Sequence, residues 1–110
     1  MYRSRDYKDV RRLLVWLLYA SRGGETRLRI LILLKQNGQL NASQLARALK
    51  VNYRTVTYHL DILEAHNLIE RIQTSHGIYY RLSNAGLTNW DLISKLLKYS
   101  KNSGMSKDQH

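Results

Sequence analysis

Three side chains near the middle of the chain, Arg54, Thr57 and Tyr58, have the chemistry needed to contact nucleic-acid bases. The planar guanidinium of an arginine can donate two hydrogen bonds to O6 and N7 of guanine. Threonine and tyrosine hydroxyls can bond bases or phosphates, and a threonine methyl group can pack against the methyl group of thymine. We therefore predict that these three residues contact base edges. The alternative is an ordinary solvated helix face.

Such contacts require a helix that presents the three side chains together. At 100° per residue, they and Asp61 fall on one side of a helix. The opposite, inward side would consist of Val56, His59, Leu60 and Leu63. Asn52 is a suitable N-cap, so we predict a helix over residues 52–66 whose first two turns enter the major groove.

Further residues around the start of this helix could hold DNA phosphates. Phosphate contacts position a protein on the duplex without carrying sequence information, and a helix N-terminus itself favours a phosphate oxygen. The residues expected at phosphates or at the groove edge are Arg47, Lys50, Asn52, Tyr53 and Thr55. Among these, Asn52 is expected mainly to cap the helix.

The segment after this helix has the alternation of a β-hairpin. Residues 69–73 and 78–82 are the predicted strands, with a turn at 74–77. In the second strand, Ile78, Tyr80 and Leu82 are expected on one face. A polar hairpin tip can reach the neighbouring minor groove or its phosphates. The residues expected to do so are Arg71, Thr74, Ser75 and His76; the alternative is a plain surface turn.

Helical periodicity predicts the elements that surround this helix and hairpin. Asn41 and Thr88 are expected as N-caps of two of them. The further predicted helices cover about residues 6–21, 25–36, 42–49 and 88–99. The predicted fold class is mainly α with a small β-hairpin, in the order α-α-α-α-β-β-α. We expect one domain over residues 1–100 and a disordered tail over 101–110.

The distribution of charge favours a polyanionic partner. The formal net charge is +10 at pH 7 in 110 residues. Residues 1–57 carry twelve Lys and Arg against three Asp and Glu, whereas residues 58–110 carry six against five. Such a basic surface suits DNA, RNA or an acidic membrane, although a generic solubility charge is the alternative.

Other functional classes find little support in the sequence. The chain has no cysteine, which excludes disulfides and thiolate metal sites. His59 and His66 are too widely spaced to share a metal on one helix, and a zinc site between subunits is left only as an alternative. We find no glycine-rich phosphate loop, nucleophile elbow or paired catalytic carboxylates. We expect no enzyme activity, no cofactor and no metal.

The two terminal helices carry more apolar surface than a core of this size needs. We predict that they form a two-fold homodimer interface, which would space two DNA-contacting helices by about one turn of DNA, roughly 34 Å. The alternative is that they fold back over the core of their own chain. The interface residues would be Leu13, Leu14, Trp16, Leu17, Leu18, Trp90, Ile93, Leu96 and Leu97.

Six short stretches carry a family resemblance. They are ETRLRIL at 25–31, LA at 45–46, TVTYHL at 55–60, LE at 63–64, NLI at 67–69 and GIYYRL at 77–82. Over about residues 24–86, the chain resembles ArsR-type winged helix-turn-helix regulators, particularly archaeal ones. The resemblance implies a homodimer on near-palindromic operators. Many members sense metals through cysteines or His/Asp/Glu clusters, and the lack of cysteine departs from the first pattern.

These observations together predict a sequence-specific regulator of transcription that binds double-stranded DNA. Helix 52–66 would enter the major groove, and the hairpin, about residues 69–82, would lie on the adjacent minor groove or backbone. The longest apolar run, residues 13–20, is too short to span a membrane, so we expect a cytoplasmic, nucleoid-associated prokaryotic protein. The alternatives are a winged-helix module that binds another protein and a non-specific architectural DNA-binding protein.

Overall fold

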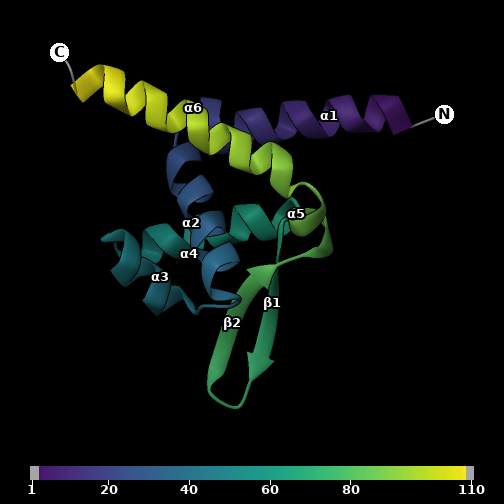
Figure 1. Ribbon diagram of the computed structural model, residues 1–110. Helices are drawn as coiled ribbons and strands as arrows, with labels where there is room; N and C mark the ends of the chain where they lie inside the picture. The colour runs from purple at the N-terminus through teal and green to yellow at the C-terminus, as the bar shows by residue number, and fades with distance from the viewer. Residues whose placement is uncertain (1–2, 109–110) are drawn as a thin grey trace.

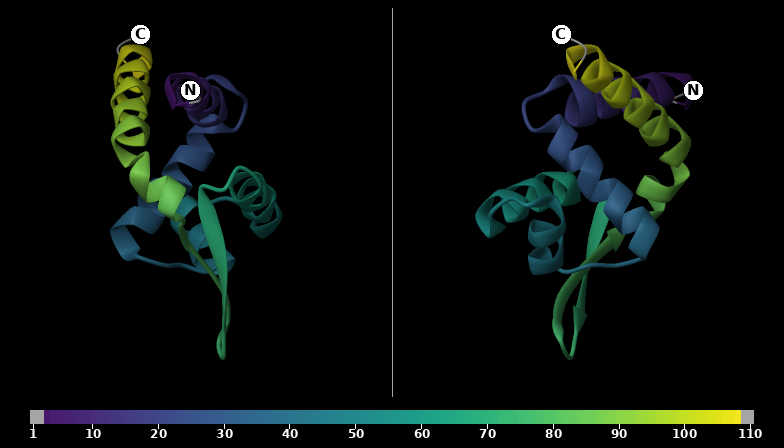
Figure 2. Two further views of the ribbon diagram at one scale, coloured as in Figure 1. Left: turned by 90° about the vertical axis from the view of Figure 1, so that its right-hand side faces the viewer. Right: turned by 60° about the vertical axis from the view of Figure 1, so that its left-hand side comes forward.

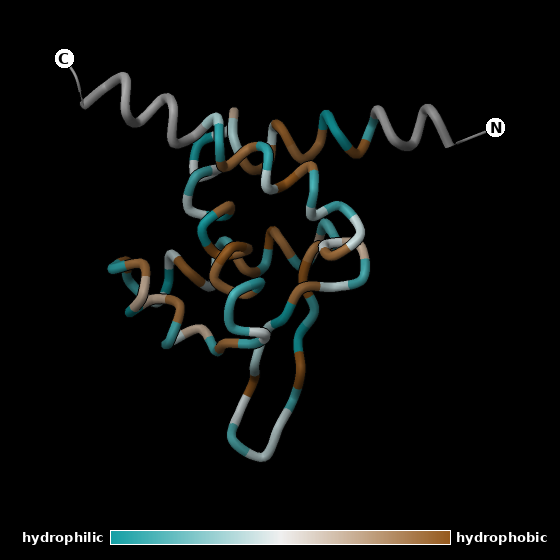
Figure 3. Tube along the Cα trace, in the orientation of Figure 1, coloured by the Kyte–Doolittle hydropathy of each residue, from teal (hydrophilic) through white to brown (hydrophobic). Residues whose placement is uncertain are grey.

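Helix α2 (Gly24–Asn37) lies at the centre of the fold, and five other elements pack against it. The structure is a computed structural model, which describes the backbone of residues 3–108 and the side chains of residues 9–99. Leu28, Ile30, Leu31 and Leu34 of α2 are at most 1% exposed. In Figure 3 the hydrophobic stretches gather on α2 and on the parts of its neighbours that surround it.

The terminal helices cross above this core (Figure 1). Helix α1 (Arg3–Val15) continues through a π-helical turn, η1 (Trp16–Ala20), and packs against α6 (Trp90–Asp108). Five of the nine predicted interface residues are buried within the chain, because both helices fold back over its own core. They are Leu14, Leu17, Leu18, Ile93 and Leu96. In the described residues, no helix is long and apolar enough to cross a membrane.

Helices α3 (Ala42–Leu49) and α4 (Tyr53–Ala65) form the predicted helix–turn–helix pair. The side chain of Asn41 accepts from the backbone N–H of Gln44, and the side chain of Gln44 accepts from that of Asn41, each at 2.8 Å. Lys50 takes a left-handed conformation (φ 59°) and reverses the chain into α4. These local signals explain why the boundaries of both helices agree with the sequence prediction.

Strands β1 (Ile69–Thr74) and β2 (Gly77–Leu82) pair in antiparallel register, with Ile69 opposite Leu82. Both views in Figure 2 show this hairpin projecting from the helical body. Tyr80 and Leu82 are buried, as the alternation predicts, but Ile78 near the tip is 40% exposed. The hairpin is tied to the body by two backbone hydrogen bonds between Tyr80 and Leu40. The predicted β-hairpin is therefore confirmed.

The end of the chain departs from the prediction. Ser83, rather than Thr88, is an N-cap: it begins a short helix, α5 (Asn84–Thr88), in which Thr88 is the last residue. Helix α6 then starts at Trp90 and continues to Asp108, not to about residue 99. The Ser83 hydroxyl donates to the Asn67 carbonyl at 2.6 Å and accepts from the Gly86 N–H. This link to the end of α4 favours the earlier cap.

We expect Gly86→Ala to destabilise the protein by about 1–3 kcal/mol, measured by urea unfolding. A Cβ at Gly86 would overlap the backbone carbonyl oxygen of Leu68, which cannot move without disturbing the start of β1. The matched control is Asn84→Ala at an exposed position of the same helix, expected to stay within about 0.5 kcal/mol of the wild type. Equal stability of the two variants would contradict this packing.

Candidate DNA-binding surface

The two sides of α4 differ as the sequence predicts. Val56, Leu60 and Leu63 are fully buried against the core. On the opposite side Arg54 is exposed, and Tyr58 is 60% exposed although its ring packs edge-on against His59. The outer surface of the first two turns is therefore open to a ligand the size of DNA.

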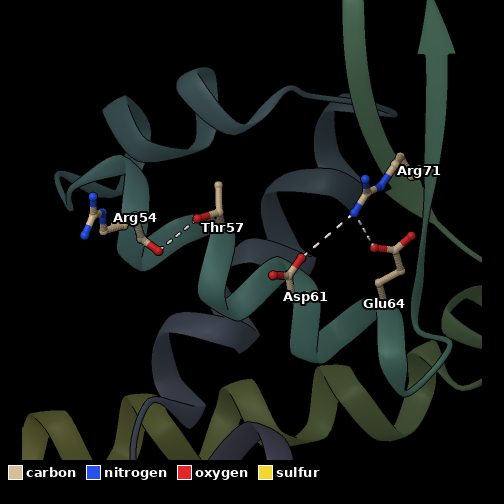
Figure 4. Close-up of polar contacts among 5 residues, drawn as sticks. All are labelled: Arg54, Thr57, Asp61, Glu64 and Arg71. Carbon is tan, nitrogen blue, oxygen red and sulfur yellow. Dashed lines mark hydrogen bonds and ion pairs between the residues drawn. The ribbon is translucent and has the colours of Figure 1, made fainter.

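Thr57 is more restricted than the other two candidate base contacts. Its hydroxyl donates to the backbone carbonyl of Arg54 at 3.0 Å (Figure 4). With that proton engaged, the oxygen can only accept a hydrogen bond from a further partner. Thr57 is thus suited to an amino group of adenine or cytosine, or to methyl contact with thymine.

Two grooves flank the N-terminal end of α4, and basic side chains lie on both. One groove is lined by Arg22, Gly23, Asn52, Arg54, Thr55, Tyr58 and His59. The other is lined by Ser43, Ala46, Arg47, Lys50, Val51 and Tyr53. Neither lining contains an Asp or Glu. The structure brings all five predicted phosphate-contacting residues to these grooves and adds Arg22, which lies far from them in sequence.

Asn52 has the capping role expected of it. Its side-chain oxygen accepts from the Thr55 N–H at 2.8 Å. Tyr53 follows directly, 57% exposed, and lies on the second groove and on a further one that reaches the hairpin. The helix start is thus ordered by Asn52, while the neighbouring aromatic ring remains accessible.

Of the four hairpin residues predicted to reach DNA, two have side chains that are engaged with other residues of the protein. Arg71 is paired with Glu64 of α4 at 2.9 Å. The Thr74 hydroxyl donates to the Gly77 carbonyl and accepts from the His76 N–H, so it stabilises the turn. Ser75 and His76 are exposed at the tip. The sequence cannot reveal these two internal roles, because they depend on the turn geometry and on the approach of α4.

The exposed part of the terminal helices is smaller than predicted but aromatic. Trp16 is 55% exposed, and Tyr19 and Tyr99 are 42% and 58% exposed, with their rings 6.2 Å apart. Trp90 is half-buried, with the ammonium of Lys35 5.8 Å from the centre of its ring. Leu13 and Leu97 are also half-buried. An interface on this face would therefore use the rim of the helices rather than their buried leucines.

Arg27 of α2 is a buried arginine that the sequence pattern alone did not single out. The residue is 3% exposed. Its guanidinium donates to the carbonyls of Leu17 and Arg22, at 2.9 and 3.2 Å, and to the Ser21 hydroxyl at 2.7 Å. The ion pairs of the described residues involve other arginines. Arg27 occupies a position on the buried stripe of α2, and that spacing was the available signal.

Arg27 also fixes His59 on the inner side of α4. One guanidinium nitrogen lies 3.0 Å from Nδ1 of His59. Because an arginine only donates, Nδ1 must accept, which places the proton of the neutral imidazole on Nε2. Burial, reinforced by the positive charge of Arg27, lowers the pKa of His59 below its ordinary value. The predicted inward position of His59 is confirmed.

The loop beside His59 needs a glycine. Gly23 has φ +83° and is the N-cap of α2. A Cβ at this position would come within 2.6 Å of Cε1 of His59.

His66, unlike His59, is exposed at the end of α4, and its Nδ1 lies 2.9 Å from the Ile62 carbonyl. Among the described residues, no three His, Asp or Glu side chains come close enough together to hold a metal ion.

The order of the helices and the hairpin defines a winged helix-turn-helix fold. A model of the MarR family matches residues 25–75, from the start of α2 to the tip of the hairpin. Proteins of that family are regulators of transcription rather than enzymes. ArsR-type regulators are a related winged helix-turn-helix family. None of the curated protein sequences compared with the chain matches it.

Solved structures of this type superpose on most of the chain. The YusO protein of Bacillus subtilis is 22% identical, with a TM-score of 0.65 over 94% of this chain and 75% of its own. MarR from E. coli is 18% identical, with a TM-score of 0.67 over 93% and 77%. The adhesin competence repressor AdcR of Streptococcus pyogenes is 19% identical, with a TM-score of 0.61 over 94% and 78%. The fold is therefore that of the MarR-type winged helix.

We expect the lowered pKa of His59 to make folding stability depend on pH. Unfolded His59 binds a proton near pH 6.5, whereas folded His59 does so only at lower pH, so stability is complete above about 6.5 and is lost as pH falls through the folded pKa. One imidazole contributes at most about 1.4 kcal/mol per pH unit. Urea unfolding between pH 7.5 and 5 measures this slope.

Two variants isolate this contribution. His59→Gln keeps an oxygen that can accept from Arg27 but cannot titrate, so the slope should decrease. His76→Gln at the exposed hairpin tip is the matched control and should leave the slope unchanged. An unchanged slope in His59→Gln would show that other groups cause the pH dependence.

Proposed function

We propose that this protein regulates transcription by sequence-specific binding to double-stranded DNA, with the first two turns of α4 in the major groove. The observation that carries the proposal is the charge around the start of α4. Arg22, Arg47, Lys50 and Arg54 line or border grooves whose linings contain no carboxylate. Phosphates on either side of a major groove meet such a surface favourably.

The geometry supports a division of roles within this surface. Arg54 and Tyr58 are exposed and carry the base contacts together with the accepting oxygen of Thr57. Arg47, Lys50 and Tyr53 hold the backbone beside the groove. Ser75 and His76 at the hairpin tip reach the neighbouring minor groove or its phosphates. In this arrangement the base contacts determine which DNA sequence is bound, and the backbone contacts contribute affinity for any sequence.

We further propose a homodimer on near-palindromic DNA. Trp16 on η1 is exposed, and the exposed rings of Tyr19 on η1 and Tyr99 on α6 lie 6.2 Å apart. Large exposed aromatics are typical of interfaces. Membership of the related ArsR-type family, which the sequence resemblance implies, is part of this proposal. Such a role would place the protein on the nucleoid, in the cytoplasm of a prokaryotic cell.

We expect Arg54→Ala to lose about 1–3 kcal/mol on a preferred duplex and to relax the preference at one base pair. Arg47→Ala, the matched control, should weaken all duplexes equally and reduce the slope of log K against log salt by about 1. Fluorescence anisotropy with labelled duplexes at several salt concentrations measures both. An equal loss on every sequence for Arg54→Ala would assign Arg54 to the backbone, and a wild-type slope near zero would reject DNA binding.

A further inference from the structure

Arg71 of β1 points to α4 rather than to the tip of the hairpin (Figure 4). One of its guanidinium nitrogens lies 2.9 Å from Oε1 of Glu64 and 3.9 Å from Oδ1 of Asp61. The guanidinium also lies 5.8 Å from the ring centre of Tyr80, its partner across the hairpin. Arg71 thus joins the hairpin to the second half of α4.

The carboxylates that Arg71 contacts lie on the helix face proposed to meet DNA. Spacings of three, four and three residues place Arg54, Thr57, Asp61 and Glu64 along one stripe of α4. The stripe is basic at its start and acidic at its end. The Asp61 side chain is 71% exposed and that of Glu64 is 35% exposed. Two uncompensated carboxylates next to a duplex would repel its phosphates.

We propose that Arg71 is a positioning residue for DNA binding: it compensates Asp61 and Glu64 and holds the hairpin against α4, and it does not itself contact DNA. This inference rests on the proposed function. It accounts for an acidic pair on a DNA-binding helix without assigning those carboxylates to bases. Because Asp61 and Glu64 are engaged by Arg71, the part of α4 that contacts bases is limited to the turns that precede Asp61.

The hairpin offers a matched control for this role. Arg81 pairs with Glu70 at 2.6 Å, and both belong to the hairpin. The Glu70–Arg81 pair adjoins the Arg71–Tyr80 pair in the register, so the two pairs lie on opposite faces of the hairpin. Since exposed ion pairs contribute little to folding stability, Arg71→Gln and Arg81→Gln should both remain folded.

The test compares duplex affinities of Arg71→Gln, Arg81→Gln and the triple variant Asp61→Asn, Glu64→Gln, Arg71→Gln by fluorescence anisotropy. We expect Arg71→Gln to bind about tenfold more weakly, because two carboxylates are left uncompensated. The triple variant should return to within about threefold of the wild type, and Arg81→Gln should match the wild type. A triple variant as weak as Arg71→Gln would show that the loss does not come from the two carboxylates and would overturn the inference.

A second measurement needs no DNA. In the free protein, ¹⁵N relaxation should show greater mobility of the Ser75 and His76 amides in Arg71→Gln than in Arg81→Gln. If that difference is found but the wild type binds no duplex, the proposed function fails while the link between hairpin and helix stands. Equal mobility in the two variants would overturn the positioning role.

Discussion

The buried guanidinium of Arg27 is the constraint on which the placement of α4 depends. A charge inside the fold is tolerated only when its donors are satisfied, and here two carbonyls, a hydroxyl and an imidazole nitrogen satisfy them. These acceptors belong to η1, to the loop before α2 and to α4. One side chain therefore connects η1 and the loop that follows it to the helix that is proposed to contact DNA.

The charge along the outer surface of α4 changes from its start to its end, and residues of neighbouring segments determine how. At its start, basic side chains from three other segments border the grooves beside it, and the helix N-terminus adds to their field. Toward its end, Asp61 and Glu64 are met by Arg71 from the hairpin. Attraction for a polyanion is thus concentrated in the first two turns. In a dimer, the terminal helices would set the distance between two such surfaces.

Periodicity and capping were sufficient to predict most of the fold and the outer face of α4. Asn41 and Asn52 cap through contacts within four residues, which is why those helix starts were correct. Contacts between residues far apart in the sequence could not be predicted from the local sequence pattern. The approach of α4 to the hairpin engages Arg71, and the link from Ser83 to Asn67 moves the helix start away from Thr88. Most of the apolar residues predicted to be covered on the terminal helices are buried. They pack against the chain's own core rather than a second subunit, a difference that periodicity does not reveal.

Selection of bound sequences from a random duplex pool is the sharpest test of base contact by α4, since every possible half-site competes for the protein at once. We expect enrichment of a defined motif, repeated as two inverted half-sites whose centres lie roughly 34 Å apart, about one turn of DNA. Recovery of salt-sensitive binding with no enriched sequence would contradict base contact by Arg54, Thr57 and Tyr58 and would indicate a non-specific DNA-binding protein.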